Sequence, residues 1–181
     1  IKNLVDFSKL GAALYRAVFK KEKPTVALLN IGSEDSKGSD LLKKSLQELR
    51  QINSDSFSFS GFIEGNHIKD GNADVIVTDG FSGNIALKTA EGTAKYIAAL
   101  VKEKFLSSWY SKFIYLLSFK IFNSIKNDLD PRKYNGGIFL GLTSPVVKSH
   151  GGTDYVGFYH SIKLCYDILN GNLQEQIQKN L

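Results

Sequence analysis

The chain has 181 residues, 43% of them hydrophobic and 23% charged, with a formal net charge of +5. Such values are typical of an ordinary globular protein of one or one and a half domains, and they exclude a disordered chain. Because Cys165 is the only cysteine, an internal disulfide and a cysteine metal cluster are excluded as well. We interpret Cys165 as a buried helical thiol and expect a reducing, cytoplasmic compartment. No uninterrupted apolar run approaches the roughly 18 to 20 residues of a membrane-spanning helix.

Hydrophobic periodicity predicts alternating helices and strands through the first half of the chain. An apolar repeat at helical spacing predicts a helix over 3–20, and the continuous apolar run 25–31 is typical of a buried parallel strand. A second helix is expected from Asp40 onward, with its leucines on one face. Two further strands are expected over 57–63, where aromatic and small residues alternate, and over 73–78, where valine and isoleucine dominate.

The second half continues with helices and shorter strands. Helical periodicity runs over 84–101, and an amphipathic run follows over 109–127. Strands are expected over 139–142 and 146–147, and a final helix over 154–169. Since strands alternate with helices, we expect a mostly parallel sheet with helices on both faces, which is an α/β fold.

The first stretch that can carry chemistry is LLNIGSEDSKG (28–38), where the predicted strand opens into a polar loop. Ligands of open parallel sheets bind outside the carboxyl ends of the strands, where this loop would lie. Lys37, among small residues, can supply a positive charge to a phosphate. A solvated loop lysine explains the same pattern.

The most informative stretch is DVIVTDGFSGN (74–84), a short strand followed at once by a helix. Free N–H groups at a helix start, together with the positive end of the helix dipole, form an anion site. Ser82, Gly83 and Asn84 lie at this start, Lys88 lies one turn further, and Asp79 at the strand tip can orient a reacting group. The alternative is ordinary turn chemistry, with Asn84 as the helix cap.

A third stretch, VVKSHGGTD (146–154), ends a strand in His150 and two glycines, with Thr153 as a plausible helix N-cap. His150 can bind phosphate or move a proton near neutral pH. It can equally be a structural histidine bonded to a loop carbonyl. His67 and His160 show no ligand spacing, and we expect no metal site.

The run over 109–127 forms the fourth stretch. One face of the predicted helix carries Tyr110, Phe113, Ile114, Leu117, Ile121 and Ile125, and lysines lie opposite. Such a helix can lie in a membrane interface, with its apolar face in the lipid and lysines toward anionic headgroups. It can also pack on another helix of the same chain or of a dimer partner. The pattern leaves both open.

Taken together, LLNIGSEDSKG (28–38), ADVIVTDGFSGNIALKTAEGTA (73–94) and GGIFLGLTSPVVKSHGGTD (136–154) resemble the PlsX family of phosphate acyltransferases in wording, order and spacing. The resemblance covers essentially the whole chain. It implies a three-layer α/β sandwich with a mostly parallel sheet, like that of isocitrate and isopropylmalate dehydrogenases.

The resemblance also implies an activity: transfer of a fatty acyl group from acyl carrier protein to orthophosphate, giving acyl phosphate for phospholipid synthesis. The implied assembly is a homodimer, without a metal or an organic cofactor and without a nucleic-acid partner. It further implies a cytoplasmic protein associated with the inner face of the membrane through a protruding helical hairpin at about 95–127. Trp109, Phe113, Ile114 and Leu117 would then contact an anionic membrane surface.

Members of this family are about twice as long, so the chain resembles their carboxy-terminal portion. The absence of any methionine fits a piece of a longer protein. Two positions depart from the family pattern. Asn66-His67 stands where many relatives have Arg-Asp, and Thr143-Ser144-Pro145 stands where Asn-Gly is usual.

The sequence shows no activated Ser or Cys triad, so we expect direct attack of phosphate on the thioester. Asp79, Asn84 and Lys37 are the expected catalytic residues. Asp79 would orient the phosphate or the leaving thiol, and Asn84 would donate to the developing oxyanion. The expected phosphate ligands are Lys37, Ser82, Gly83, Lys88 and His150. An acyl-CoA:phosphate acyltransferase of the phosphotransacetylase type and a non-catalytic membrane-surface adaptor are the alternatives.

Overall fold

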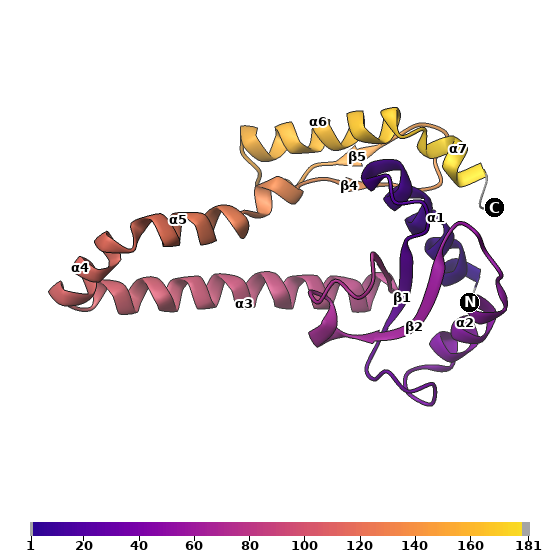
Figure 1. The fold of residues 1–181 in the computed structure, drawn as a ribbon, viewed down its shortest axis with the longest axis horizontal. Helices are drawn as coiled ribbons and strands as arrows, with labels where there is room; N and C mark the ends of the chain where they lie inside the picture. Colours follow the sequence, from indigo (N-terminus) through magenta and orange to yellow (C-terminus); the bar gives the residue numbers. More distant parts are fainter. Residues whose placement is uncertain (1, 179–181) are drawn as a thin grey trace.

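The first half of the chain forms a parallel three-stranded sheet with two helices against it. The structure is a computed structural model that describes residues 2–178 (Figure 1). Its elements here are α1 (Lys2–Phe19), β1 (Thr25–Asn30), α2 (Asp40–Gln51), β2 (Ser58–Glu64), the 3₁₀ turn η1 (Gly65–His67) and β3 (Val75–Val77). The strand order is β2-β1-β3 and both pairings are parallel. The expected α/β class with parallel strands is therefore confirmed.

The sheet's core lies where α1 and α2 cover β1. Val26 and Leu28 alternate along β1 and so point to one face, and both are fully buried. On that face they join Leu49 of α2 and Leu4 and Ala12 of α1 in one hydrophobic cluster. The leucine face expected for the second helix thus packs on the sheet.

The second half begins with three helices and ends in a small α/β unit. Its elements are α3 (Gly80–Leu106), α4 (Trp109–Leu117), α5 (Phe119–Asp128), the 3₁₀ turn η2 (Pro131–Tyr134), β4 (Gly137–Ile138), β5 (Val147–Lys148), α6 (Tyr155–Asn170) and α7 (Leu173–Gln178). The strands β4 and β5 pair antiparallel in a separate sheet. Ile168 and Leu173 pack against Ala13 and Ala17, so α1 also contributes to a second hydrophobic cluster.

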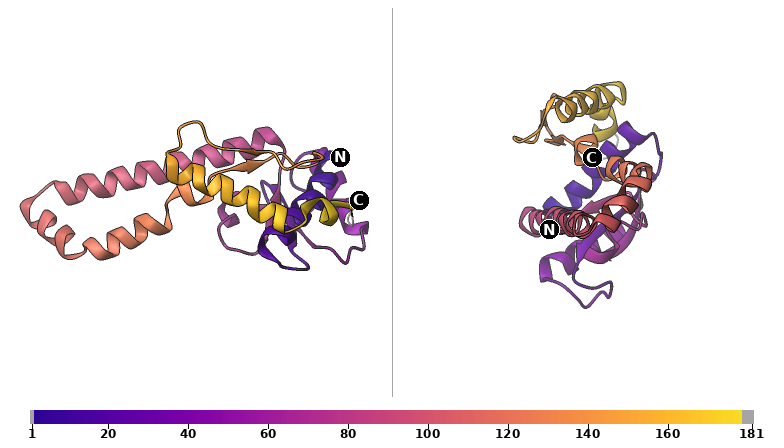
Figure 2. Two further views of the ribbon diagram at one scale, coloured as in Figure 1. Left: turned by 90° about the horizontal axis from the view of Figure 1, so that it is seen from above. Right: turned by 90° about the vertical axis from the view of Figure 1, so that its left-hand side faces the viewer.

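Helices α3, α4 and α5 form an arm, the name used below for residues 80–128. Figure 1 and the left view of Figure 2 show α3 running out from the sheet and α4 and α5 returning beside it. The rings of Phe105, Tyr115 and Phe122 contact one another between the outgoing and returning helices. No residue of these three helices is buried, so the arm is held by few internal contacts.

Some predicted boundaries were wrong for physical reasons. Helix α3 begins at Gly80 and not at Asn84, because Asp79 caps it, and apolar spacing does not register a cap. The run over 109–127 is broken at Ser118 into α4 and α5. Asp154, not Thr153, caps α6. Cys165 lies in α6 as predicted but is only half-buried.

The expected strands over 139–142 and 146–147 also differ from the structure. Pairing is limited to Gly137–Ile138 with Val147–Lys148, extended by a bond from Phe139 N–H to the Val146 carbonyl at 2.9 Å. Gly141 has a φ of 85°, a left-handed conformation that interrupts an extended strand. The apolar run therefore continues into a loop.

Candidate active site

The candidate site lies at the carboxyl edge of the parallel sheet. Asn30 at the end of β1 is level with Glu64 at the end of β2, and Leu28 is level with Val77 at the end of β3. The loop 31–39, the turn η1 and the start of α3 therefore leave the sheet from one edge. This is the place where open parallel sheets bind ligands.

Asp79 caps α3 with its carboxylate. One oxygen, Oδ1, accepts the backbone N–H groups of Phe81 at 3.0 Å and Ser82 at 2.9 Å. These bonds, that from Ser82 first, lower the pKa of Asp79, so its carboxylate is ionised at neutral pH. The N–H groups expected to be free for an anion are thus already bonded to an anion of the chain itself. The turn is nevertheless open to solvent, since Gly80, Phe81 and Ser82 are all exposed.

Gly83 permits the close approach of α3 to the end of β3. A Cβ at this position would lie 2.5 Å from Cγ2 of Thr78, far inside van der Waals contact. Ser82 and Gly83 both lie in the first turn of α3, ahead of the helix start predicted at Asn84.

One face of α3 carries the remaining polar groups of this region. Asn84 and Lys88 are four residues apart and so share that face, and both are exposed. Lys88 Nζ lies 2.9 Å from Oε2 of Glu91. This bond is the main cause of a lowered pKa at Glu91, to which the charges of Lys95 and His150 add.

His150 belongs to the loop between β5 and α6. Its Nδ1 accepts the backbone N–H of Gly152 at 3.3 Å, so the neutral ring carries its proton on Nε2. The side chain is exposed. Its backbone N–H donates to Oδ1 of Asn135 at 3.1 Å. His150 thus presents one exposed N–H donor from this loop.

Lys37 lies at the same edge of the sheet, in the loop after β1. An ion pair between Asp35 and Arg50 of α2 fixes this loop, and Nδ2 of Asn30 donates to the Lys37 carbonyl at 3.2 Å. The Lys37 side chain is exposed. No hydrogen bond or ion pair described for residues 2–178 joins it to Asp79 or Asn84. Lys37 therefore stands apart from the hydrogen bonds at the start of α3.

Two residues of this region were missed by the sequence reasoning. Glu91 stands three residues after Lys88, and that spacing was a usable signal for an ion pair on a helix. Asn135 gave no signal, because its partners come from the loop 149–153 and from α6. Only the folded chain brings these segments together.

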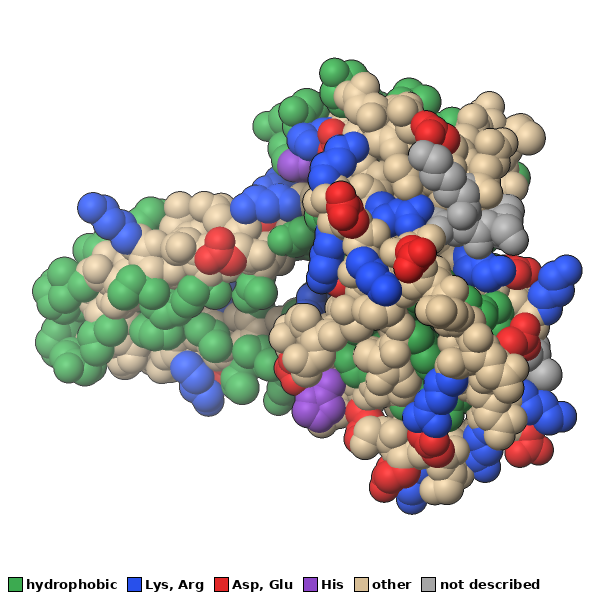
Figure 3. Space-filling model, turned by 45° about the vertical axis from the view of Figure 1, so that its right-hand side comes forward, with side chains coloured by type: hydrophobic (Ala, Val, Ile, Leu, Met, Phe, Trp, Pro, Cys, Tyr) green, Lys and Arg blue, Asp and Glu red, His purple; other side chains and the backbone are tan. Residues whose placement is uncertain are grey.

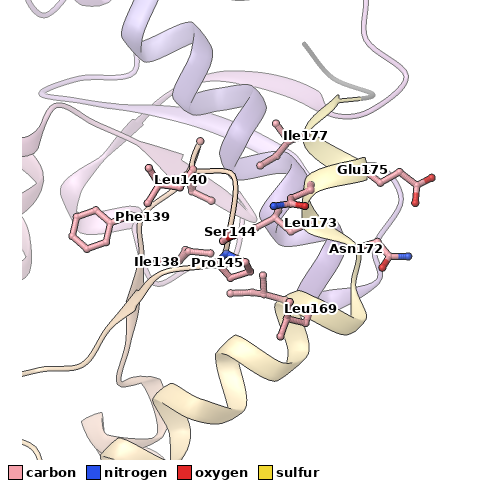
Figure 4. A pocket seen from close by; sticks show the side chains of 14 residues that line it. Ile138, Phe139, Leu140, Ser144, Pro145, Leu169, Asn172, Leu173, Glu175 and Ile177 are labelled. Carbon is pink, nitrogen blue, oxygen red and sulfur yellow. The ribbon is translucent and has the colours of Figure 1, made fainter.

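Two further features of residues 2–178 bear on ligand binding. Within residues 2–178, no three His, Cys, Asp or Glu side chains are grouped as metal ligands. A cavity of about 390 Å³ lies between the loop after β4 and the junction of α6 with α7 (Figure 4). It is lined mainly by apolar side chains, Phe139, Leu140 and Leu173 among them, and by none of the candidate site residues.

The arm exposes an apolar surface beside this site. Trp109 is 82% exposed, Leu117 71% and Phe113 55%, whereas Ile114 is half-buried. Hydrophobic side chains gather along the arm, with lysines among them (Figure 3). Within the described part of the chain, no helix combines the length and the hydropathy that crossing a membrane requires.

These features define an α/β protein with a candidate ligand site at the carboxyl edge of a parallel sheet, at the capped start of α3. A family model described as "Fatty acid synthesis protein" matches residues 1–176. The chain belongs to this family, the PlsX-type family that its motifs resemble.

Curated relatives agree with this family. The chain is 49% identical to a phosphate acyltransferase of Pelagibacter ubique over 99% of its length, which is 54% of that protein. It is 46% identical to a phosphate acyltransferase of Azorhizobium caulinodans, of which it covers 51%, and 44% identical to one of Brucella canis, of which it covers 52%. The chain thus spans about half the length of these relatives.

Proposed function

We propose that the chain forms part of a phosphate acyltransferase that moves a fatty acyl group from acyl carrier protein to orthophosphate. The proposal depends above all on Asp79, an ionised carboxylate held at the open start of α3. Membership in a family whose relatives carry the name phosphate acyltransferase supports it. The acyl phosphate would supply phospholipid synthesis.

The proposed chemistry is direct displacement. A phosphate oxygen attacks the thioester carbonyl, the new C–O bond forms, and collapse of the oxyanion breaks the C–S bond. The ionised carboxylate of Asp79 orients the attacking phosphate, and the proton of the phosphate passes to the leaving thiolate. Asn84, exposed on the next helical turn, donates its side-chain N–H to the oxyanion.

Phosphate itself would be held by cations and donors around this face. Lys88 would exchange its bond to Glu91 for the phosphate, and His150 would donate from Nε2. Ser82 and Gly83 complete the expected set at the first turn of α3, and Lys37 would have to move in from its loop. Because the backbone N–H groups are taken by Asp79, side chains carry most of this binding.

The experiment uses the complete gene product, including any residues encoded beyond this chain. Acyl phosphate formation is measured with acyl carrier protein and with CoA as acyl donor. Turnover on the carrier protein at least tenfold above that on CoA is expected, and the reverse preference would favour a phosphotransacetylase-type enzyme. Asn84→Ala should reduce turnover by about 100- to 1,000-fold, as the loss of one oxyanion donor does. Asn53→Ala, at an exposed loop position, is the matched control.

The surface of the arm favours a further role in membrane association. Trp109 and Leu117 are exposed at its outer end, with Lys112 and Lys120 nearby in the sequence. We propose that this end contacts an anionic membrane surface from the cytoplasmic side, as amphipathic helices do. We also propose that the protein is a homodimer and that its fold is a dehydrogenase-like three-layer sandwich. The dimer requires a second copy of the chain.

Vesicle cosedimentation tests the membrane contact. Trp109→Ser with Leu117→Ser should reduce binding to phosphatidylglycerol vesicles at least tenfold, whereas Phe19→Ser, at an exposed aromatic residue outside the arm, should not. Equal binding of both variants would remove the arm from membrane contact. Vesicle binding without acyl phosphate formation would support the non-catalytic adaptor.

A further inference from the structure

Asn135 is a half-buried residue at which three segments of the chain meet. It follows η2 and precedes β4, and its Nδ2 lies 2.8 Å from the carbonyl of Gly157 in α6. The same nitrogen lies 2.9 Å from Oγ of Ser149, 3.0 Å from Oγ of Ser161 and 3.3 Å from Oγ1 of Thr153. Two N–H hydrogens thus serve four oxygens from the loop after β5 and from α6.

The other atom of the same amide holds the histidine loop directly. Oδ1 of Asn135 accepts the backbone N–H of His150 at 3.1 Å. His150 Nδ1 in turn accepts the N–H of Gly152, so the ring orientation depends on the path of the backbone through residues 150–152. The amide of Asn135 therefore holds this loop at three points, which are the Ser149 hydroxyl, the His150 backbone N–H and the Thr153 hydroxyl.

The surroundings are shaped for this amide. Gly157 has no side chain, and a Cβ there would lie 2.0 Å from Oγ1 of Thr153 and 3.2 Å from Nδ2 of Asn135. Ser161 is buried and donates to the Gly157 carbonyl at 3.3 Å, which leaves its lone pairs for Asn135. A second tether, from Arg132 Nη1 to Oδ2 of Asp154 at 2.8 Å, holds the preceding turn against the start of α6.

We infer that Asn135 is a positioning residue for phosphate binding, which it controls by holding the His150 loop in place. The inference rests on the proposed function, since it assigns His150 Nε2–H as a phosphate donor. A hydrophobic side chain at 135 would leave the His150 N–H without its partner and remove the bonds to Ser149 and Thr153. The loop would then lose the position in which His150 is held.

The kinetic test measures initial rates against phosphate concentration in the complete gene product. Asn135→Ala should raise the KM for phosphate about tenfold, the effect of losing one or two hydrogen bonds. The KM for the acyl donor should stay within twofold. Asn53→Ala is the control. An unchanged phosphate KM in Asn135→Ala overturns the inference.

A double-mutant cycle separates positioning from general destabilisation. If Asn135 acts through His150, adding Asn135→Ala to His150→Ala should cost no more than a further twofold in phosphate KM. Multiplying losses would show that Asn135 acts independently of His150, which contradicts the inference. Should Asn135→Ala fail to fold, Asn135→Asp decides. It keeps the acceptor for His150 N–H but sets a carboxylate against the Gly157 carbonyl, and at least a threefold rise is expected.

Amide hydrogen exchange tests the loop without any turnover. The His150 N–H should exchange at least tenfold faster in Asn135→Ala than in the unmodified protein, while amides of β1 stay unchanged. If His150 exchange is unaffected, the inference fails whatever the enzyme does. If exchange rises but the unmodified protein forms no acyl phosphate, Asn135 still holds the loop and the proposed function is what fails.

Discussion

At the scale of single residues, Gly83 shows how closely α3 and β3 approach each other. Gly83→Ala would place a methyl group 2.5 Å from Cγ2 of Thr78 and should destabilise the fold by about 1–3 kcal/mol through overpacking. Gly92→Ala is the matched control, because it lies in the same helix with open space around it. There alanine should stabilise by up to about 1 kcal/mol through helix propensity. Urea unfolding of both variants separates the steric contact at Gly83 from the general effect of alanine on helix stability. Equal changes in the free energy of unfolding would refute the close approach of α3 and β3.

Asp79 is a second residue at which one group serves two purposes. Asp79→Ala removes the helix cap and should lower the free energy of unfolding by about 1 kcal/mol. Asp79→Asn retains a capping oxygen, so its free energy of unfolding should stay within a few tenths of a kcal/mol of the original protein. On the proposed mechanism Asp79→Asn should still lower turnover by about 100-fold or more, since a neutral amide lacks the charge that orients the protonated phosphate. Unfolding and turnover measured on the same two variants check this separation. Normal turnover in Asp79→Asn would remove the carboxylate from the chemistry.

The pH dependence of Asp79 follows from its lowered pKa. A depressed folded-state pKa stabilises the protein above the unfolded value near 3.9, and this contribution is lost as pH falls through the folded-state pKa. Asp79→Asn has no such group. The stability difference between the original protein and this variant should therefore shrink as pH falls below about 4. Parallel curves from pH 7 to pH 3 would contradict the assignment.

At the scale of elements, α1 is the helix that joins the two packed parts of the chain. Ala12 faces the sheet cluster, while Ala13 and Ala17 face α6 and α7. The backbone at Gly171 lies so near that a Cβ would be 2.2 Å from the Ala17 carbonyl. Ala17→Leu should therefore cost about 1–3 kcal/mol, whereas Ala90→Leu, exposed on α3, should be nearly neutral. Urea unfolding measures both changes, and similar values would show that α1 is not closely packed there.

At the scale of the whole molecule, the sequence predicted most of what local patterns can encode. The apolar run 25–31 and the helix from Asp40 were placed within a residue or two, because burial on a sheet face imposes a pattern on each segment. The start of α3 was missed because a cap is a hydrogen-bond choice made by Asp79, not a hydrophobic repeat. Asn135 escaped notice because its partners are 14 to 26 residues away in sequence. Local patterns cannot show such contacts.

The arm is the part of the molecule whose stability should be separable from the rest. Its helices contain no buried residue, and its outer end is held by the ring contacts of Phe105, Tyr115 and Phe122. Phe122→Ala should therefore speed amide exchange over about 100–128 at least tenfold while amides of β1 keep their protection. Phe119→Ala, the same change at an exposed residue of the same helix, should leave exchange within twofold. If Phe122→Ala instead accelerates exchange equally in β1 and in the arm, the arm and the sheet unfold as one cooperative unit. Opening of the aromatic cluster would then be coupled to the core around Val26 and Leu28.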